Sequence, residues 1–509
     1  MMEEKTKKYI FNPYYGLKND KKRIVLCNAP AFKIPAELAE DEISSFIHPV
    51  YAMAFSFFDG NNSLENCLNK ISELFGASIE ESYDFLKPFL DNKERVGIDY
   101  DKHVYEFPKR ILLDNSEFNF PVRQLNYEDY VIDDELDFST YRLYEGPTAI
   151  SILVNTLCQT DCIYCYVDRK NKIDCEIPIE RICELIREAK KDGVITFDIS
   201  GTEIFLYKYW DILVDELLKN GYYPYLSTKV PISGEILRKL KELGIKDLQL
   251  SIDTADNKEA KIVNKVKIDN YADAMLDTLA RTEQFGFNMA VNAVITKYNC
   301  SEKGIKQLLD AINKQKNIEK VTLNPAESSM YCHESQFNDL KMTIEQITAM
   351  EDFIDSIKSN YGFTIHIAGY IEEEAYKNDF ATRQKKFRER AMCTANITQV
   401  CILPDGQVTI CEELYWHPKF LIGNVVQNAM KEIWNSESAL ALANIKRDSV
   451  SAHSPCKTCK EFDSCRQFQG VCWSDVLSVY GEDNWDFPAS DCPYAPFPYH
   501  AIYHENEKK

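Results

Sequence analysis

The stretch SILVNTLCQTDCIYCYVDRK, residues 151–170, places three cysteines within eight residues, directly after an apolar run that predicts a buried strand. These candidate catalytic and metal-binding residues are Cys158, Cys162 and Cys165, spaced CxxxCxxC. A [4Fe–4S] cluster has four irons, and electron carriers ligate all four with thiolates. A loop with only three cysteines leaves one iron free for an exogenous ligand. Taken alone, the loop is also compatible with a zinc knuckle.

The composition of the chain restricts its partners and its compartment. The 509 residues carry a net charge of −21, which argues against nucleic acid or an anionic membrane as a partner. No apolar run reaches the ~18 residues of a membrane span, and the N-terminus lacks the apolar core of a signal peptide, so we expect a cytoplasmic protein. In that reducing compartment the 17 cysteines favour metal ligation or redox chemistry over disulfides.

A repeated alternation of strand and helix begins near residue 147 and predicts the fold class. Amphipathic patterns such as PIERICELIREAKKDG (178–193) separate short apolar runs, which indicates an α/β fold with a parallel sheet curled into a partial (β/α)6 TIM-type barrel. Catalytic residues of such a barrel lie at the C-terminal ends of its strands. The predicted strands are 148–155, 194–200, 222–228, 246–253, 287–296 and 320–326.

The residues before the barrel predict a small α+β module of the winged-helix type over 1–115. Two hairpins, at 8–30 and 96–107, enclose three helical patterns, and Ser63 and Ser78 are candidate N-caps. An acidic linker, 116–146, follows. We expect the barrel to span 147–375 and a cysteine-rich domain to span 376–509.

The three-cysteine loop, with aromatic Tyr164 before its last cysteine and its position after the first barrel strand, resembles the radical S-adenosylmethionine (SAM) superfamily. The resemblance implies that the fourth iron chelates the methionine amine and carboxylate of SAM. It implies that an electron from the cluster then cleaves SAM to a 5′-deoxyadenosyl radical, which takes a hydrogen atom from the substrate. Tyr164 and Tyr166 would shield the cluster from water, and a flavodoxin or ferredoxin would supply the electron.

The same resemblance implies SAM contacts at the ends of the later strands. The sequence SGTE (200–203) stands where the family has a Gly-Gly-Glu motif, with Thr202 in place of the second glycine. Glu203 would accept from the SAM ammonium, and Thr228 and Lys229 would face the carboxylate. Each of these residues is also compatible with an ordinary strand end. The implied cofactor-binding residues are Tyr164, Ser200, Gly201, Glu203, Thr228, Lys229, Ser251, Asp253 and Asn292.

Eight cysteines crowd into residues 393–492 and resemble the SPASM extension of peptide-modifying radical SAM enzymes, which holds two auxiliary [4Fe–4S] clusters. The gap between Cys465 and Cys472 is six residues where the usual pattern has three. Structural zinc sites are the alternative. The resemblance implies auxiliary cluster I on Cys393, Cys411 and Cys472, and auxiliary cluster II on Cys456, Cys459, Cys465 and Cys492.

Cys401 is the nearby candidate for a fourth ligand of auxiliary cluster I. If Asp405 and Gly406 form a two-residue hairpin turn, Cys401 pairs with Ile410 and points away from Cys411. A slip of one residue reverses this orientation. An open iron on cluster I would be a docking point for a substrate thiolate.

The N-terminal module resembles the leader-recognition domain of ribosomal peptide maturases. Such domains bind an extended leader at a sheet edge, and RIVLCN (23–28) is our candidate edge strand. Together the domains predict a peptide maturase that forms thioether cross-links between cysteine sulfur and carbon. The alternatives are carbon–carbon or carbon–oxygen cross-linking, a formylglycine maturase, and a non-catalytic iron–sulfur electron carrier or peptide-binding scaffold.

Overall fold

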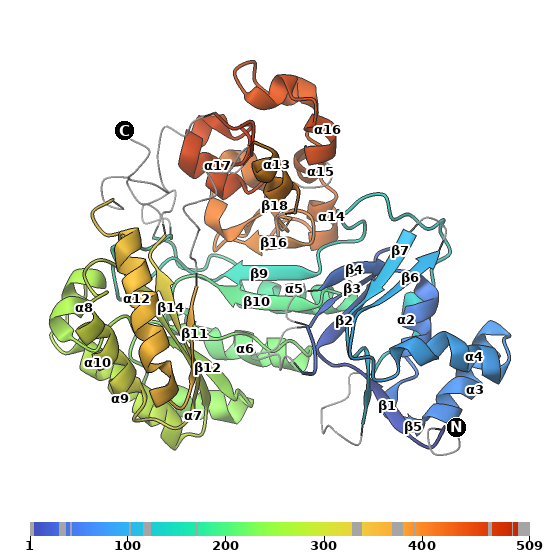
Figure 1. The fold of residues 1–509 in the computed structure, drawn as a ribbon, viewed down its shortest axis with the longest axis horizontal. Coiled ribbons are helices and arrows are strands. Elements are labelled where there is room, and N and C mark those ends of the chain that lie inside the picture. Colours follow the sequence, from blue (N-terminus) through green and yellow to red (C-terminus); the bar gives the residue numbers. More distant parts are fainter. Residues whose placement is uncertain are drawn as a thin grey trace. The chain divides into compact units, whose positions relative to one another are not determined.

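The computed structural model forms two compact units (Figure 1). The first comprises residues 1–150, 186–197 and 220–223, and the second comprises 151–185, 198–219 and 224–509. Each unit is considered by itself below. The structure describes residues 5–29, 37–40, 43–100, 103–115, 124–167, 172–327, 338–368, 380–389, 392–466, 471–490 and 492–496.

The first unit contains the two predicted hairpins and three small antiparallel sheets. The sheet orders are β5-β1-β8, β2-β3-β4 and β6-β7. RIVLCN forms β3, which lies between β2 and β4, so our expectation that it is an edge strand is wrong. The edges of that sheet are β2 and β4. The strands are β1 (Lys8–Phe11), β2 (Tyr15–Asn19), β3 (Ile24–Asn28), β4 (Ser44–Ile47), β5 (Asp59–Ser63), β6 (Val96–Tyr100), β7 (His103–Phe107) and β8 (Leu112–Asp114).

The three predicted helices of this unit are present, and the last two begin at the expected serine caps. They are α2 (Pro49–Phe55), α3 (Leu64–Phe75) and α4 (Ile79–Leu86). The Ser63 hydroxyl accepts from the Asn66 amide, and Ser78 forms a capping box with Glu81. Their apolar faces pack with the strands around a core of stacked and edge-on aromatic rings.

A buried ion pair joins the β2–β3 turn to the acidic linker. Asp20 and Arg23 are both fully buried, with 3.0 Å between Oδ2 and Nε. The other Asp20 oxygen accepts from the amides of Tyr144 and Glu145 at 2.7 and 3.0 Å. Because both charges are removed from water, the linker backbone that satisfies them is part of the folded unit.

The predicted barrel strands are present, which confirms the α/β fold class; most of their residues belong to the second unit, and only the first residues of β9 and β10 belong to the first. β11 to β15 form a parallel sheet in sequence order, while β9 and β10 belong to a sheet of order β10-β9-β16-β17-β18. The last parallel strand, β15 (Thr364–Ile367), was not predicted. The six predicted strands are β9 (Ala149–Leu153), β10 (Thr196–Ser200), β11 (Ser227–Thr228), β12 (Asp247–Ser251), β13 (Asn288–Ile295) and β14 (Ile318–Pro325).

Amphipathic helices alternate with these strands (Figure 1). Because a helix connects each parallel strand to the next, the C-terminal ends of β11 to β15 all lie at the same edge of their sheet. The register aligns Ser251 of β12 with Asn292 of β13 at that edge. The helices are α5 (Ile179–Lys191), α6 (Trp210–Lys219), α7 (Gly234–Leu243), α8 (Asn257–Val263), α9 (Tyr271–Gln284), α10 (Glu302–Ile312) and α12 (Ile344–Ile357).

The C-terminal part begins with a hairpin whose register differs from our expectation. Cys401 pairs with Thr409, not with Ile410. The turn contains three residues instead of two: the Leu403 amide donates to the Gln407 carbonyl at 2.8 Å, and Gly406 has a φ of +84°. A three-residue turn that ends in a left-handed glycine shifts the pairing by one position.

The remaining elements are short. The segment after residue 429 forms two helices, because Ser436 caps a new N-terminus by accepting from the Ala439 amide. Among the described residues, we find no helix with the length and apolar character that a bilayer span requires. These elements are β16 (Gln399–Ile402), β17 (Gln407–Thr409), β18 (Leu421–Asn424), α13 (Phe380–Glu389), α14 (Met430–Trp434), α15 (Glu437–Ala443), α16 (Phe462–Ser464) and α17 (Trp473–Tyr480).

Candidate active site

The three-cysteine loop follows β9 and is organised by a threonine. The Thr160 hydroxyl lies 3.1 Å from Cys158 Sγ and 3.3 Å from Cys162 Sγ. Cys162 is buried, and the structure leaves Cys158 exposed. Although Cys158 is exposed, the protein atoms around its sulfur partly desolvate it and raise its pKa above the ordinary value, and the bonds from Thr160 oppose this rise. Thiols of this kind stay protonated until a metal displaces the protons.

No group of three or more His, Cys, Asp or Glu side chains in the described part of the chain converges closely enough to hold a single metal ion. A cubane cluster holds its thiolates on separate irons, so its ligands do not have to meet at one point. The loop is therefore compatible with a cluster, and a zinc site stays the alternative.

An apolar wall shields the last cysteine of the loop. Cys165 packs against a buried cluster of Leu153, Val167, Leu403 and Tyr415. Tyr166, which we expected to shield the cluster, is 40% exposed. The shielding thus comes from β9 and the residue 403–415 segment.

Gly201 directly follows β10, at a position where a side chain would clash. Its φ is +94°, and an added Cβ would lie 1.5 Å from Leu153 Cδ1. The close approach of Gly201 to Leu153 brings the two strand ends together. Thr202, which replaces the second family glycine, donates to the backbone carbonyl of Asn155 at 2.5 Å and to its side-chain oxygen at 2.9 Å.

Glu203 lies in a pocket of hydrogen-bond donors and is 1% exposed. The Thr228 hydroxyl is 2.8 Å from both carboxylate oxygens, and the Lys229 amide donates to Oε2 at 3.2 Å. Burial raises the pKa of Glu203 to about 7, and the bonds from Thr228 and Lys229 oppose that rise. A buried carboxyl that titrates near neutrality is suited to a positively charged ligand group.

A second buried carboxylate, Asp253, collects charged and polar partners at the end of β12. Lys229 Nζ lies 2.9 Å from Oδ1, and Asn264 Nδ2 lies 2.5 Å from Oδ2. The Tyr164 hydroxyl donates to the same Oδ2. Burial lowers the pKa of Lys229, but Asp253 and the Cys162 and Cys158 thiolates raise it more. A protonated lysine is thereby held beside the cysteine loop.

The three remaining predicted SAM-binding residues are Ser251, Asn292 and Ser200, and the first two lie apart from the third. Ser251 and Asn292 are register partners on neighbouring strands, and Ser251 Oγ accepts from Gln249 at 2.9 Å. The Ser200 hydroxyl instead faces Cys401 and Glu412, whose pKa values it lowers against the larger effect of burial. The structure therefore groups Tyr164, Lys229 and Asp253, and separately Glu203 and Thr228, while Ser200 faces the C-terminal part.

Several polar side chains of this site were not predicted. Asn264 donates to Asp253 and lies 3.5 Å from Cys162 Sγ. The Asn155 side chain donates to the Glu203 carbonyl at 3.1 Å, and Asn299 donates to the Asp253 carbonyl at 2.9 Å. Asn155 lies at a predicted strand end, which is a usable signal. Asn264 follows a helix in a loop, where nothing in the sequence pattern marks it.

The cysteines implied for auxiliary cluster I lie together. Burial raises the pKa of Cys411, and Glu413, Cys393 and Cys472 raise it further. Burial likewise raises the pKa of Cys472 to about 12, with Cys393 and Glu413 among the added causes. Ser474 Oγ donates to Glu413 at 2.6 Å, which fixes that carboxylate beside the thiols.

Cys401 faces a different set of groups. It is fully buried, which raises its pKa to about 12; the Ser151 hydroxyl opposes this, and Glu412 adds to it. The observed register is the one-residue slip that reverses the expected orientation of Cys401, so our expectation that strand alternation turns it away from Cys411 is wrong. The strand ends at Thr409, and the groups that act on Cys411 are Glu413, Cys393 and Cys472. The structure thus brings Cys393, Cys411 and Cys472 together and surrounds Cys401 with hydroxyls and a carboxyl.

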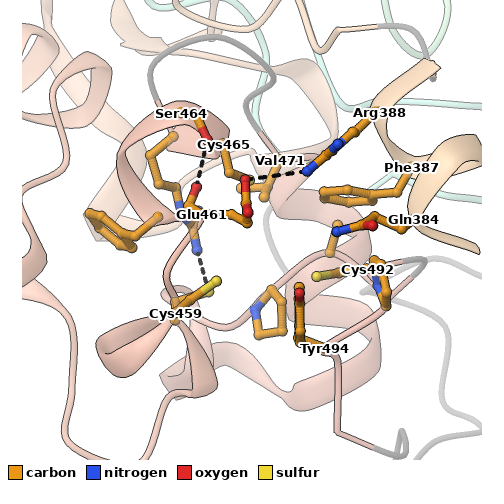
Figure 2. A pocket seen from close by; sticks show the side chains of 16 residues that line it. Gln384, Phe387, Arg388, Cys459, Glu461, Ser464, Cys465, Val471, Cys492 and Tyr494 are labelled. Carbon is orange, nitrogen blue, oxygen red and sulfur yellow. Dashed lines mark hydrogen bonds and ion pairs between the residues drawn. The ribbon is translucent and has the colours of Figure 1, made fainter. Parts of the chain in front are cut away.

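The cysteines implied for auxiliary cluster II line one cavity of about 330 Å³ (Figure 2). In Figure 2 the labelled Cys459, Cys465 and Cys492 surround one open space, and Cys456 also lines it. Burial raises the pKa of Cys492 to about 12, and the three other thiols of the cavity raise it further. Phe387, Phe462 and Val471 supply apolar walls.

The donors around this cavity fit an iron–sulfur cluster. Arg466 Nη2 lies 3.3 Å from Cys456 Sγ. Its Nε and Nη1 are buried and have no hydrogen-bond partner among the described residues. Buried donors without partners are rare in native proteins, and sulfur atoms of a cluster in the cavity would accept from them.

Comparisons with known proteins support this assignment of cofactors. Residues 152–312 match the radical SAM superfamily, and residues 393–460 match the iron–sulfur cluster-binding SPASM domain. The chain is 22% identical over 323 residues to a PqqA peptide cyclase of Streptomyces rochei, covering 62% of this chain and 82% of the relative. It is 27% identical over 246 residues to a probable GTP 3′,8-cyclase of Methanosarcina mazei, covering 44% and 66%.

Solved structures show the same fold. Streptococcus suis SuiB bound to the precursor peptide SuiA aligns with a TM-score of 0.61 and 14% identity, covering 95% of this chain and 99% of SuiB. SuiB bound to S-adenosylmethionine aligns with a TM-score of 0.60 and 15% identity over the same shares. The chain therefore combines a SAM-binding radical SAM domain with a SPASM domain that binds iron–sulfur clusters.

Proposed function

We propose that this radical SAM and SPASM chain modifies a ribosomally synthesised precursor peptide by forming thioether bonds between cysteine sulfur and carbon. The proposal is carried by the mutual influence of Cys393, Cys411 and Cys472, whose thiols raise the pKa values of Cys411 and Cys472, whereas the groups that act on Cys401 are Ser151, Ser200 and Glu412. A cluster on three cysteines keeps one iron open, and an open iron can bind the thiolate of a substrate cysteine. The peptide cyclase and the peptide-bound SuiB structure support a peptide substrate.

The site residues have distinct roles in this proposal. When bound, the cluster and SAM supply a 5′-deoxyadenosyl radical that takes a hydrogen atom from a substrate carbon. Cys158, Cys162 and Cys165 hold the cluster, and Glu203 accepts from the SAM ammonium. Lys229, held by Asp253, balances the negative charge of the cysteine loop. The apolar wall at Leu153 and Tyr415 keeps water from the radical.

The balance of atoms and electrons in this reaction requires an electron acceptor, and the auxiliary clusters are the candidates. The substrate thiol gives up its proton, the carbon loses one hydrogen atom, and a sulfur–carbon bond forms. One electron is left over, and cluster I or II accepts it. The product is therefore two hydrogens lighter for each cross-link.

Unit 1 is our candidate for peptide binding. Its sheet β2-β3-β4 has two edge strands, and an extended leader can add to such an edge through backbone hydrogen bonds. Because β3 is central, the leader site of this proposal is β2 or β4. A domain boundary near residue 115, a linker over 116–146 and a barrel over 147–375 remain part of the proposal.

Anaerobic coexpression with the precursor peptide encoded beside this gene, followed by mass spectrometry, tests the function. We expect a loss of two hydrogens per cross-link, with cysteines protected from alkylation. A two-hydrogen loss with all thiols still reactive would indicate carbon–carbon or carbon–oxygen cross-linking instead. Failure of the reconstituted protein to cleave SAM would leave only an electron carrier or a peptide-binding scaffold.

A further inference from the structure

The cavity of the four C-terminal cysteines contains two arginines whose surroundings differ. Arg388 lies at the rim, where its side chain is 55% exposed and its guanidinium is 3.5 Å from the Glu461 carboxylate. Arg466 makes its hydrogen bonds to Cys456 Sγ and to two backbone carbonyls. The charge of Arg388 is therefore balanced by a carboxylate, whereas Arg466 directs its charge at a cysteine sulfur.

The backbone around Arg466 fixes this orientation. Arg466 directly follows α16 and Cys465, and its Nη2 donates to the carbonyls of Asp486 and Phe487 at 3.1 Å each. Asp486 is itself held, because the Ser454 hydroxyl donates to its carbonyl at 2.8 Å. The residue 486–487 segment, itself held by Ser454, thus keeps the Arg466 guanidinium against Cys456.

The unused donors of Arg466 extend the same argument. Nε and Nη1 are buried in the wall of the cavity without partners among the described residues. A guanidinium presents its donors in a rigid planar fork, so the contact of Nη2 with Cys456 also fixes the positions of Nε and Nη1, which still need acceptors. The sulfides and thiolates of a [4Fe–4S] cluster are acceptors of that kind.

We propose that Arg466 is a positioning residue that makes the cluster on Cys456, Cys459, Cys465 and Cys492 easier to reduce. Reduction adds one negative charge to the cluster, and a fixed cation that donates hydrogen bonds to its sulfurs stabilises the reduced state more than the oxidised state. This inference rests on the proposed function, because it makes cluster II the better acceptor for the electron left over after bond formation.

An anaerobic redox titration followed by electron paramagnetic resonance tests this role on the full-length protein. The background is a variant with Cys158, Cys162 and Cys165 changed to Ala, which removes the signal of the SAM cluster. At a fixed potential near the midpoint, we expect Arg466→Gln to lower the reduced-to-oxidised ratio of cluster II at least threefold. Arg466→Lys, which keeps the charge, is expected to recover part of this loss. Arg388→Gln, the matched control in the same cavity, is expected to titrate like the parent.

Iron and sulfide analysis separates the possible failures. An unchanged ratio in Arg466→Gln at full iron content overturns the role of Arg466 and leaves the proposed function intact. Equal shifts in the Gln and Lys variants, or loss of the cluster in both, show that Arg466 only anchors the Asp486 loop, and they overturn the proposal as well. Zinc in place of iron in the parent protein overturns the proposed function itself.

Discussion

Thr228 donates its hydroxyl to the carboxylate of Glu203, 2.8 Å from each oxygen, so that one buried acid at the end of β10 is held by the end of β11. Because burial raises the pKa of Glu203 to about 7, its charge changes within the physiological pH range. If Glu203 accepts from the SAM ammonium as we propose, this relationship makes SAM binding sensitive to pH, and Thr228 adjusts the pH at which that change occurs.

The first prediction concerns SAM affinity between pH 6 and pH 8. Below a pKa of about 7 Glu203 is protonated and has no charge to offer the SAM ammonium, so affinity is expected to rise with pH by roughly tenfold across this interval. Equilibrium dialysis of the reconstituted protein under anaerobic conditions measures this rise. In Glu203→Gln the rise in SAM affinity that comes from ionisation of Glu203 should be absent. In Thr228→Val the midpoint of the rise should move to higher pH, because the Thr228 hydrogen bond lowers the pKa of Glu203. A pH profile of Glu203→Gln equal to that of the parent would remove Glu203 from the site.

The second prediction concerns Gly201. An alanine there has a left-handed φ and a Cβ 1.5 Å from Leu153, so we expect a loss of roughly 2–4 kcal/mol in stability. The matched control is Gly244→Ala, at a φ of +91° with nothing within 4 Å, which isolates the backbone cost of about 1 kcal/mol. Leu153→Ala should restore part of the melting temperature of Gly201→Ala. Equal losses in Gly201→Ala and Gly244→Ala would mean that the contact with Leu153 is unimportant.

The third prediction concerns the ion pair of Lys229 and Asp253, whose side chains are 15% and 0% exposed. Asp253→Asn leaves a buried lysine without its counter-charge, and we expect a cost of roughly 3–5 kcal/mol. The double variant Asp253→Asn, Lys229→Met should be more stable than Asp253→Asn alone. Lys306 and Asp310, an exposed pair, provide the control and should couple by less than about 0.5 kcal/mol. Thermal unfolding of the four variants of each cycle measures both couplings.

The fourth prediction separates the cluster that cleaves SAM from the cluster that serves the product. Cys158→Ala should abolish release of 5′-deoxyadenosine, because the cysteine belongs to the loop that carries the SAM cluster. Cys456→Ala should retain part of that release and lose most of the cross-linked peptide. Chromatography of the nucleoside and mass spectrometry of the peptide measure the two outcomes in one reaction. Wild-type turnover by Cys158→Ala would refute the assignment of the loop.

The sequence pattern predicted the six strands of the α/β part and the closeness of Cys158, Cys162 and Cys165 because both depend on local spacing. The grouping of Cys393 and Cys411 with the distant Cys472 was implied by the resemblance to the SPASM extension. Cysteines two or three residues apart stay together in any fold, and the α/β alternation places strand ends at one edge. The position of β3 was mispredicted for the opposite reason. Its neighbour β4 begins 16 residues after β3 ends, and no local pattern reports that pairing.

The other differences come from turn chemistry and from isolated polar residues. Pro404 joins Asp405 and Gly406 in a three-residue turn, and that single added residue changed the partner of Cys401 from Ile410 to Thr409. Asn264 and Arg466 each bond to a cysteine sulfur, but neither belongs to a spacing motif. The roles of such residues depend on tertiary contacts, so they cannot be predicted from the sequence pattern and are identified only in the structure.

The last prediction concerns Cys401, whose surroundings are Ser151, Glu412 and Ser200. If Cys393, Cys411 and Cys472 alone hold auxiliary cluster I, Cys401→Ser should retain the iron content and the paramagnetic signal of that cluster. Cys411→Ser, in the same hairpin, should lose both and serves as the matched comparison. The open iron should then respond to a cysteine-containing precursor peptide with a change in the signal of cluster I in Cys401→Ser and parent alike. Loss of the cluster in Cys401→Ser would show four-cysteine ligation, leave no iron free for a substrate thiolate and remove the main support for thioether formation.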